Sequence, residues 1–239
     1  MSARVGLRLI SLPEWRWKDP GRGALLRYEP GNWGDILKGE WLCQWLEWKL
    51  SGGGRQLRYQ DPFCGWPEYP VTESTRRRVL NSPARRYAGY LGLSSASLVA
   101  RHARSLGLQL ESHLSDRETA LDLKPCDLLL FDPYDFFERW LEWNDLLLEA
   151  SHDRDIVVYL YNKSPRGVSQ FRQYQALRER WKGRPLVLGR VPADSVLPRA
   201  WHEVWLVGPS AAQAGLVGPL RETSLQLHRH ISEPGVFEG

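Results

Sequence analysis

The chain has 239 residues, a length that suits one large domain or one domain with a small appendage. Its 42% hydrophobic and 25% charged content excludes wholesale disorder, and a formal charge of +4 permits a polyanionic partner without requiring one. No apolar stretch reaches membrane-spanning length, and the first residues lack the hydrophobic core of a signal peptide. Three cysteines without metal-type spacing fit reduced thiols, so we expect a cytoplasmic protein with no metal site.

Apolar periodicity and turn signals predict strands that alternate with helices along most of the chain. Strands are expected at residues 5–12, 56–60, 87–94, 108–111, 127–131, 156–161, 185–191 and 201–207. Helices are expected at 35–50, within 68–86, and at 96–105, 136–150, 169–181 and 216–229.

This alternation is typical of an α/β protein with a Rossmann-like, doubly wound, mostly parallel sheet. The last two strands have no helix between them, so we expect an antiparallel pair at one edge of the sheet. We expect one domain over residues 1–239, with an amino-terminal extension over 1–30 and a small insertion over 66–86.

Twelve tryptophans are the compositional oddity of the chain. Trp41, Trp45 and Trp48 recur at the spacing of one helical face. We interpret that face as core, although a base-stacking platform is the alternative.

The stretch over 124–137 is the first candidate for a functional site. Four large apolar residues, 128–131, read as a strand buried on both faces, and Asp132, Pro133 and Tyr134 follow them. Parallel α/β sheets bind ligands outside the carboxyl ends of their strands. This turn would therefore place a carboxylate, a stiff backbone and a flat ring in a binding crevice. The alternative is an ordinary strand end, since Asp-Pro often starts a turn.

The loop over 59–67 is where a cofactor would sit, because it is the first turn between a strand and a helix. Only Gly65 is available for close backbone approach, and the chain has no G-x-G-x-x-G or P-loop. A cofactor held by its phosphates is therefore not expected. S-adenosylmethionine has no phosphates, so it does not need a glycine-rich phosphate-binding loop. After the expected second strand, Ser94 stands where an acid would hold the ribose. Asp116 is placed to accept from the adenine amino group.

The segment over 28–39 resembles the amino-terminal signature of the RlmJ family, Y-R-H-x-F-H-A-G-N-x-A-D-V-L-K-H. The shared core runs from Gly31-Asn32 through Asp35 to Lys38. In chain order, residues 61–65 stand at the family's D-T-H-A-G-A-G, 96–101 near its G-S-P-L-I-A-R, and 131–134 at its I-D-P-P-Y. The resemblance covers most of the chain from about residue 25 at low identity.

RlmJ proteins are S-adenosylmethionine-dependent methyltransferases that act on adenine N6 of large-subunit ribosomal RNA. The resemblance therefore implies a class I methyltransferase fold, that cofactor and a nucleic-acid partner, RNA before DNA. In this interpretation Asp132 and the carbonyl of Pro133 accept the two amino hydrogens, and Tyr134 stacks on the extruded base. The cofactor-binding residues would be Lys38, Asp61, Phe63, Gly65, Ser94 and Asp116, and the substrate-binding residues Tyr28, Asn32, Arg76, Arg77 and Arg78.

The chain also departs from this family pattern. The glycine loop keeps one glycine and has Phe63 in place of a histidine, Gly39 replaces the histidine after the lysine, and the Asp-Pro-Pro-Tyr motif is one proline short. These departures leave two alternatives open. One is a catalytically inactive relative that binds nucleic acid or protein, and the other is an enzyme that uses the same cofactor on a different substrate.

Overall fold

The computed structural model describes residues 17–18, 25–26, 31–64, 67–115, 123–133, 136–162, 168–193 and 201–232. Its centre is a six-stranded sheet in the order β4-β3-β5-β6-β8-β7. The strands are β3 (Gln56–Asp61), β4 (Gln109–Leu114), β5 (Leu128–Phe131), β6 (Asp155–Asn162), β7 (Leu186–Pro192) and β8 (Trp201–Val207). A separate two-stranded ribbon is formed by β1 (Trp17–Lys18) and β2 (Leu25–Leu26).

Strands β3 to β6 run parallel to one another, whereas β8 runs antiparallel to both β6 and β7. The expected mostly parallel sheet with an antiparallel pair at one edge is therefore confirmed. The strand expected at residues 5–12 lies outside the described residues.

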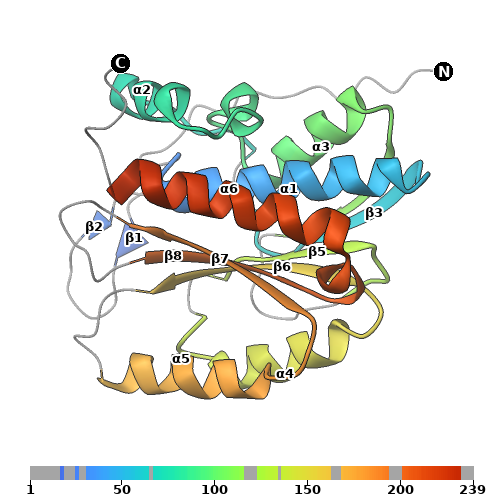
Figure 1. The fold of residues 1–239 in the computed structure, drawn as a ribbon, viewed down its shortest axis with the longest axis vertical. Helices are drawn as coiled ribbons and strands as arrows, with labels where there is room; N and C mark the ends of the chain where they lie inside the picture. The colour runs from blue at the N-terminus through green and yellow to red at the C-terminus, as the bar shows by residue number, and fades with distance from the viewer. Residues whose placement is uncertain are drawn as a thin grey trace.

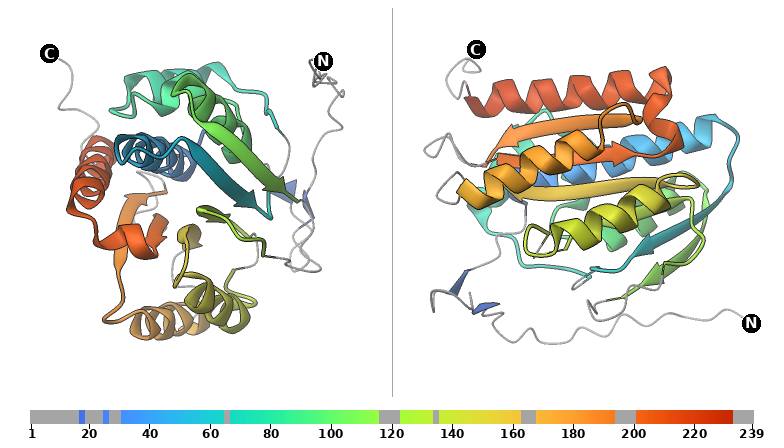
Figure 2. Two further views of the ribbon diagram at one scale, coloured as in Figure 1. Left: turned by 90° about the vertical axis from the view of Figure 1, so that its right-hand side faces the viewer. Right: turned by 90° about the horizontal axis from the view of Figure 1, so that it is seen from below.

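Helices cover both faces of the sheet (Figures 1 and 2). One face carries α1 (Trp33–Ser51), α3 (Ser95–Ser105) and α6 (Ala214–Ser232), and the other carries α4 (Trp140–Ala150) and α5 (Val168–Arg180). Strand β5 lies in the middle, and its side chains alternate between the two cores. Leu128 and Leu130 pack under α1, and Leu129 and Phe131 pack over α4.

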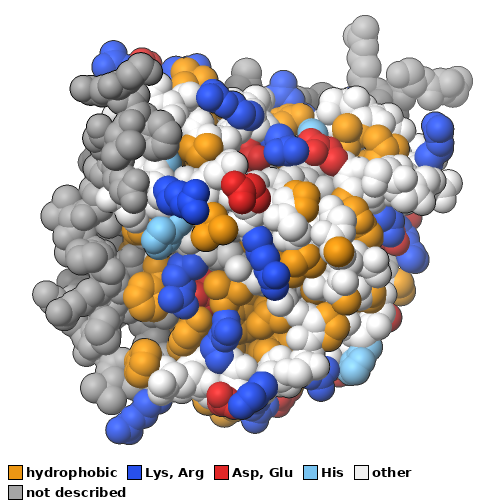
Figure 3. All heavy atoms as spheres, viewed as in Figure 1, with side chains coloured by type: hydrophobic (Ala, Val, Ile, Leu, Met, Phe, Trp, Pro, Cys, Tyr) orange, Lys and Arg blue, Asp and Glu red, His pale blue; other side chains and the backbone are white. Residues whose placement is uncertain are grey.

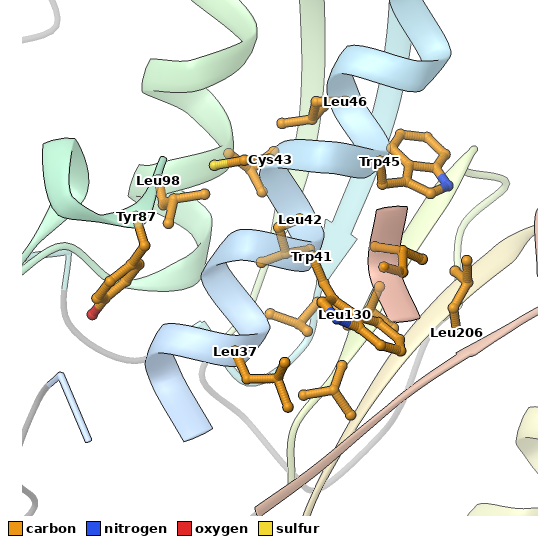
Figure 4. Packing of buried hydrophobic residues seen from close by; sticks show 14 of the residues in the cluster. Leu37, Trp41, Leu42, Cys43, Trp45, Leu46, Tyr87, Leu98, Leu130 and Leu206 are labelled. Carbon is orange, nitrogen blue, oxygen red and sulfur yellow. The ribbon is translucent and has the colours of Figure 1, made fainter. Parts of the chain in front are cut away.

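Helix α1 is buried on nearly all sides because the sheet, α3 and α6 enclose it. Trp41 and Trp45 are each 1% exposed, which confirms that the tryptophan face belongs to the core (Figure 4). Their indole N–H groups donate to Ser224 of α6 at 3.1 Å and to Asp155 of β6 at 2.8 Å. The helix is thus fixed to both neighbours by packing and by hydrogen bonds.

The strand expected at residues 87–94 is wrong. Tyr87–Tyr90 forms a 3-10 helix, η1, and Gly92 has a φ of 84°, which ends any extended run. Tyr87 is buried against α1, so the apolar pattern here reflects docking onto helices rather than membership of the sheet. The second strand of the sheet is consequently β4.

Helix α2 (Glu73–Asn81) begins where its start signal predicts, with Thr72 capping the N–H of Thr75. Helix α4 begins at Trp140, four residues later than expected. Among the described residues, no helix is long and apolar enough to cross a membrane.

Candidate active site at the carboxyl ends of the central strands

The site forms where β5 ends against the first turns of α1. Asp132 directly follows β5, and the ammonium of Lys38 donates to its Oδ2 at 2.6 Å across 94 residues of sequence. Lys38 also lies 3.4 Å from Asp35 Oδ1 and 4.8 Å from the centre of the Tyr159 ring. The Lys38 side chain is 7% exposed and that of Asp132 is 24% exposed. The structure therefore joins two residues that the sequence predicted separately.

The first turn of α1 fixes Asp35 beside Lys38. Asn32 caps the helix, because its Oδ1 accepts from the backbone N–H groups of Gly34 and Asp35. The other Asp35 oxygen accepts from the Gly31 N–H at 3.0 Å and the Asn32 amide at 3.1 Å. The signature segment is thus a cap that aims a carboxylate at Lys38. Substrate contact by Asn32 stays a prediction.

Asp61 closes β3 and is the second buried acid of the site. It is 1% exposed and accepts from the Tyr59 hydroxyl at 3.2 Å and the Phe63 N–H at 3.1 Å. Burial, reinforced by the charge of Asp132, raises the pKa of Asp61 to about 7, against the lowering effect of its hydrogen bonds and of Lys38. The raised pKa brings the titration of Asp61 into the neutral range.

The remaining charges of the site depend on one another. Burial raises the pKa of Asp132 above its ordinary value, and the ammonium of Lys38 opposes that rise. Burial lowers the pKa of Lys38, but Asp132, Asp35 and Asp61 outweigh it, so the pKa stays above its usual range. Three carboxyl groups thus lie around one ammonium, so acidic groups outnumber basic groups in the site.

Sequence reasoning missed an aromatic wall behind Lys38. The Tyr159 hydroxyl and His202 Nδ1 lie 2.6 Å apart, and the two rings stack. Burial lowers the pKa of His202 to about 4, so this histidine is neutral at pH 7. An added Cβ on Gly34 would lie 2.5 Å from the Tyr159 hydroxyl, so only glycine fits at that turn of α1. In the sequence, Tyr159 stands within an apolar run. That run predicts a strand, but it does not predict that the tyrosine ring packs behind Lys38.

Ser94 does not follow a strand. It is a buried cap of α3, where its hydroxyl accepts from the Ser97 N–H at 3.2 Å. The supposed loss of the acid after the second strand therefore rested on a misplaced strand, since β4 ends at Leu114 and Asp116 follows two residues later in the sequence. Cofactor contact by Ser94 stays a prediction. Four other predicted site residues lie outside the described residues, namely Tyr28, Gly65, Asp116 and Tyr134.

Two departures from the family pattern have structural counterparts. The ring of Phe63 packs edge-on against the rings of Phe131 and Trp143 in the core under α4. The distances between ring centres are 5.2 Å and 6.1 Å. An added Cβ on Gly39 would lie 2.3 Å from the Tyr87 ring, so no histidine fits there without moving that ring. Cofactor contact by Phe63 stays a prediction.

The predicted arginine patch is divided in the structure. Arg76 and Arg77 are exposed on α2 and pair weakly with Glu73, at 3.9 and 3.3 Å. The Arg78 guanidinium lies 5.9 Å from the centre of the Trp33 ring, near the start of α1. A role of these three arginines in nucleic-acid binding remains a prediction.

The fold is similar to that of the Legionella pneumophila protein LPL1258, described as family-model DUF519. The TM-score is 0.59 at 13% identity, over 86% of this chain and 94% of that chain. This likeness shows the fold alone.

Two more distant matches are the O-methyltransferase TomG of Streptomyces achromogenes in complex with SAM and the 16S rRNA methyltransferase RmtF in complex with S-adenosyl-L-homocysteine. TomG has a TM-score of 0.32 at 13% identity, over 72% of this chain and 79% of its own. RmtF has a TM-score of 0.30 at 18% identity, over 70% of this chain and 64% of its own. TM-scores this low establish neither a shared fold nor a shared activity. No family model and no curated protein matches the sequence.

Proposed function

We propose that the protein is an S-adenosylmethionine-dependent methyltransferase that acts on an exocyclic amino group of a nucleobase, with adenine N6 in RNA as the first candidate. The observation that carries this proposal is the Lys38–Asp132 pair at the carboxyl end of the central strand. Open α/β sheets bind their ligands at that edge. The resemblance of the signature segments to the RlmJ family supports the same assignment.

The chemistry of the site suits this cofactor. Asp35, Asp61 and Asp132 lie near one ammonium, so the site offers more carboxyl groups than Lys38 alone pairs with, which favours a cationic ligand. When bound, S-adenosylmethionine supplies an activated methyl group on a positive sulfonium. Asp61 at the end of β3 and the main chain of Ser115, which accepts from the Cys64 N–H at 3.0 Å, border the place where it would lie.

Asp132 can orient an amino group for attack. The described residues give no hydrogen bond to its Oδ1, whereas Oδ2 is held by Lys38. Oδ1 and the carbonyl of Pro133 would accept the two amino hydrogens, which localises a lone pair otherwise conjugated with the base. The proton released after methyl transfer passes to Asp132 or to solvent. Lys38 favours the ionised form of Asp132 and fixes its orientation.

Transfer of labelled methyl from S-adenosylmethionine to RNA and DNA tests the proposal, and Asp132→Asn is the decisive variant. We expect transfer to an amino nitrogen and a loss of about 100-fold or more in Asp132→Asn, the typical cost of removing one preorganised polar contact. The matched control is Asp153→Asn, an exposed acid at the opposite end of the sheet that pairs with Arg154. Equal rates in the two variants would contradict the role of Asp132.

The second candidate function is a non-catalytic module that retains the fold. It is favoured by the packing of Phe63 into the core and by the filled space beside Gly39, because both remove groups that the family pattern provides. Cofactor binding separates the candidates, since a module of this kind has no need of S-adenosylmethionine.

A further inference from the structure

A cleft lined by two arginines lies between the end of α2 and the carboxyl-terminal end of α6. Its volume is about 330 Å³. Asn81, Ser82 and Arg85 line one wall, and Gln226, Arg229 and His230 line the other. The two walls come from segments that are far apart in the sequence, so local sequence patterns do not join them.

The two arginines of the cleft are available to a ligand. Within the part of the chain that the structure describes, neither Arg85 nor Arg229 has a carboxylate partner. The adjacent Arg86 differs, because its Nε lies 2.9 Å from Glu47 and it also contacts Glu40 at 3.5 Å. Lys and Arg side chains gather on the surface that carries α6, as Figure 3 shows.

The cleft adjoins the start of α1. The His230 ring lies edge-on to Trp33, with 5.7 Å between ring centres, and Arg78 lies on the same ring. Trp33 is the first residue of α1, and Lys38 follows five residues later, a rise of roughly 7.5 Å along the helix. A chain bound in the cleft therefore lies at the same end of α1 as Asp132.

We propose that this cleft binds the sugar-phosphate backbone of a single-stranded nucleic-acid segment beside the target base, and this inference rests on the function proposed above. Arginine suits phosphate, and asparagine, serine and glutamine side chains hydrogen-bond to phosphate and sugar oxygens. A base that enters a pocket must leave its stack, which favours a single-stranded segment next to it.

The test is fluorescence anisotropy with a labelled single-stranded oligoribonucleotide at several salt concentrations. The double variant Arg85→Gln/Arg229→Gln should bind at least about tenfold more weakly than the wild type. Its slope of log affinity against log salt should be shallower by about 1.4, because two phosphate contacts are lost at about 0.7 each. The control Arg101→Gln/Arg104→Gln removes the same charge from exposed positions of α3 and should leave affinity nearly unchanged.

Equal affinity and slope in the two double variants would overturn the inference, as would the absence of RNA binding by the wild type. Sedimentation with phosphatidylserine vesicles provides a further arm. Loss of vesicle binding in the cleft variant, with RNA binding unchanged, would assign the cleft to lipid headgroups instead.

Calorimetric titration with S-adenosylmethionine separates this inference from the proposed function. Cleft-dependent RNA binding without cofactor binding would remove the methyltransferase proposal and leave the cleft. Cofactor binding and methyl transfer that do not depend on Arg85 and Arg229 would remove the cleft and leave the methyltransferase.

Discussion

The two ends of the central sheet both carry buried carboxylates, but they hold them differently. At the amino-terminal end of β6, Asp155 accepts from the Trp45 indole at 2.8 Å and from the Ser210 N–H at 2.9 Å. Both partners are neutral donors. At the carboxyl ends of β3 and β5, Lys38 provides the only ammonium that interacts with Asp61 and Asp132 among the interactions described above. It donates a hydrogen bond to Asp132 and lowers the pKa of Asp61 electrostatically.

Under the proposed function, this difference distinguishes a structural acid from the acids of the active site. Asp155 joins α1, β6 and the segment after β8, and its hydrogen bonds stabilise that junction. The acids at the other end have raised pKa values, so their ionised forms oppose folding. Groups perturbed in this way concentrate at functional sites. We therefore propose that chemistry takes place at one end of the sheet, whereas the acid at the other end stabilises the fold.

The largest expected effect is on the pH dependence of stability at Asp61. Its pKa rises from 3.8 to about 7 on folding, so ionisation progressively destabilises the folded state as the pH rises between those values. Asp61→Asn removes this loss. Between pH 4 and pH 8, the free energy of unfolding of the variant should rise by about 4 kcal/mol relative to that of the wild type. Urea unfolding at both pH values measures it, and a gain under about 1 kcal/mol would contradict the buried, high-pKa Asp61.

The next effect concerns the structural acid. Asp155→Ala leaves the Trp45 indole and the Ser210 N–H without their acceptor, and we expect a loss of about 3 kcal/mol in the free energy of unfolding. Urea unfolding measures the loss, and calorimetry should find cofactor affinity unchanged in the folded variant. A variant that stays fully stable but loses cofactor would reverse the assignment of the two ends.

Gly34→Ala tests the aromatic wall behind Lys38. The new methyl group would lie 2.5 Å from the Tyr159 hydroxyl and 2.7 Å from His202 Cγ, so we expect a loss of about 2 kcal/mol in stability. Gly218→Ala is the control, because its Cβ would meet nothing within 4 Å in helix α6. That change should be neutral or stabilising by about 0.5–1 kcal/mol. Thermal unfolding of the two variants measures the difference, and equal stability of the two would contradict the close packing of Gly34 against Tyr159.

The smallest effect separates a chemical from a structural role of Lys38. Without its ammonium the pKa of Asp132 should rise, so methyl transfer by Lys38→Met should fall at pH 7 and recover towards high pH. We expect the lower limb of the pH–rate profile to move up by about one unit, or about 1.4 kcal/mol. Lys38→Arg should retain the wild-type profile. A uniform loss at every pH would instead indicate a structural role.

The alternation of strands and helices was predictable because each apolar run has the period of its element. Residues 87–94 were misread because a segment that docks on helices can show the same apolar spacing as a strand. Asp132 and Lys38 were each visible as motif residues. Their pairing across 94 residues was not, since it depends on how α1 lies over β5. The raised pKa of Asp61 and the α6 wall of the cleft also depend on tertiary packing, which local sequence patterns do not encode.

Calorimetric titration of the protein with S-adenosylmethionine and S-adenosylhomocysteine tests the central claim most directly. We expect one site of micromolar affinity that is lost in Gly65→Trp, which places a bulky ring in the loop after β3, and that is retained in Asp155→Asn. Absence of binding to the wild-type protein would contradict the methyltransferase account and leave the charged cluster around Lys38 without its proposed ligand.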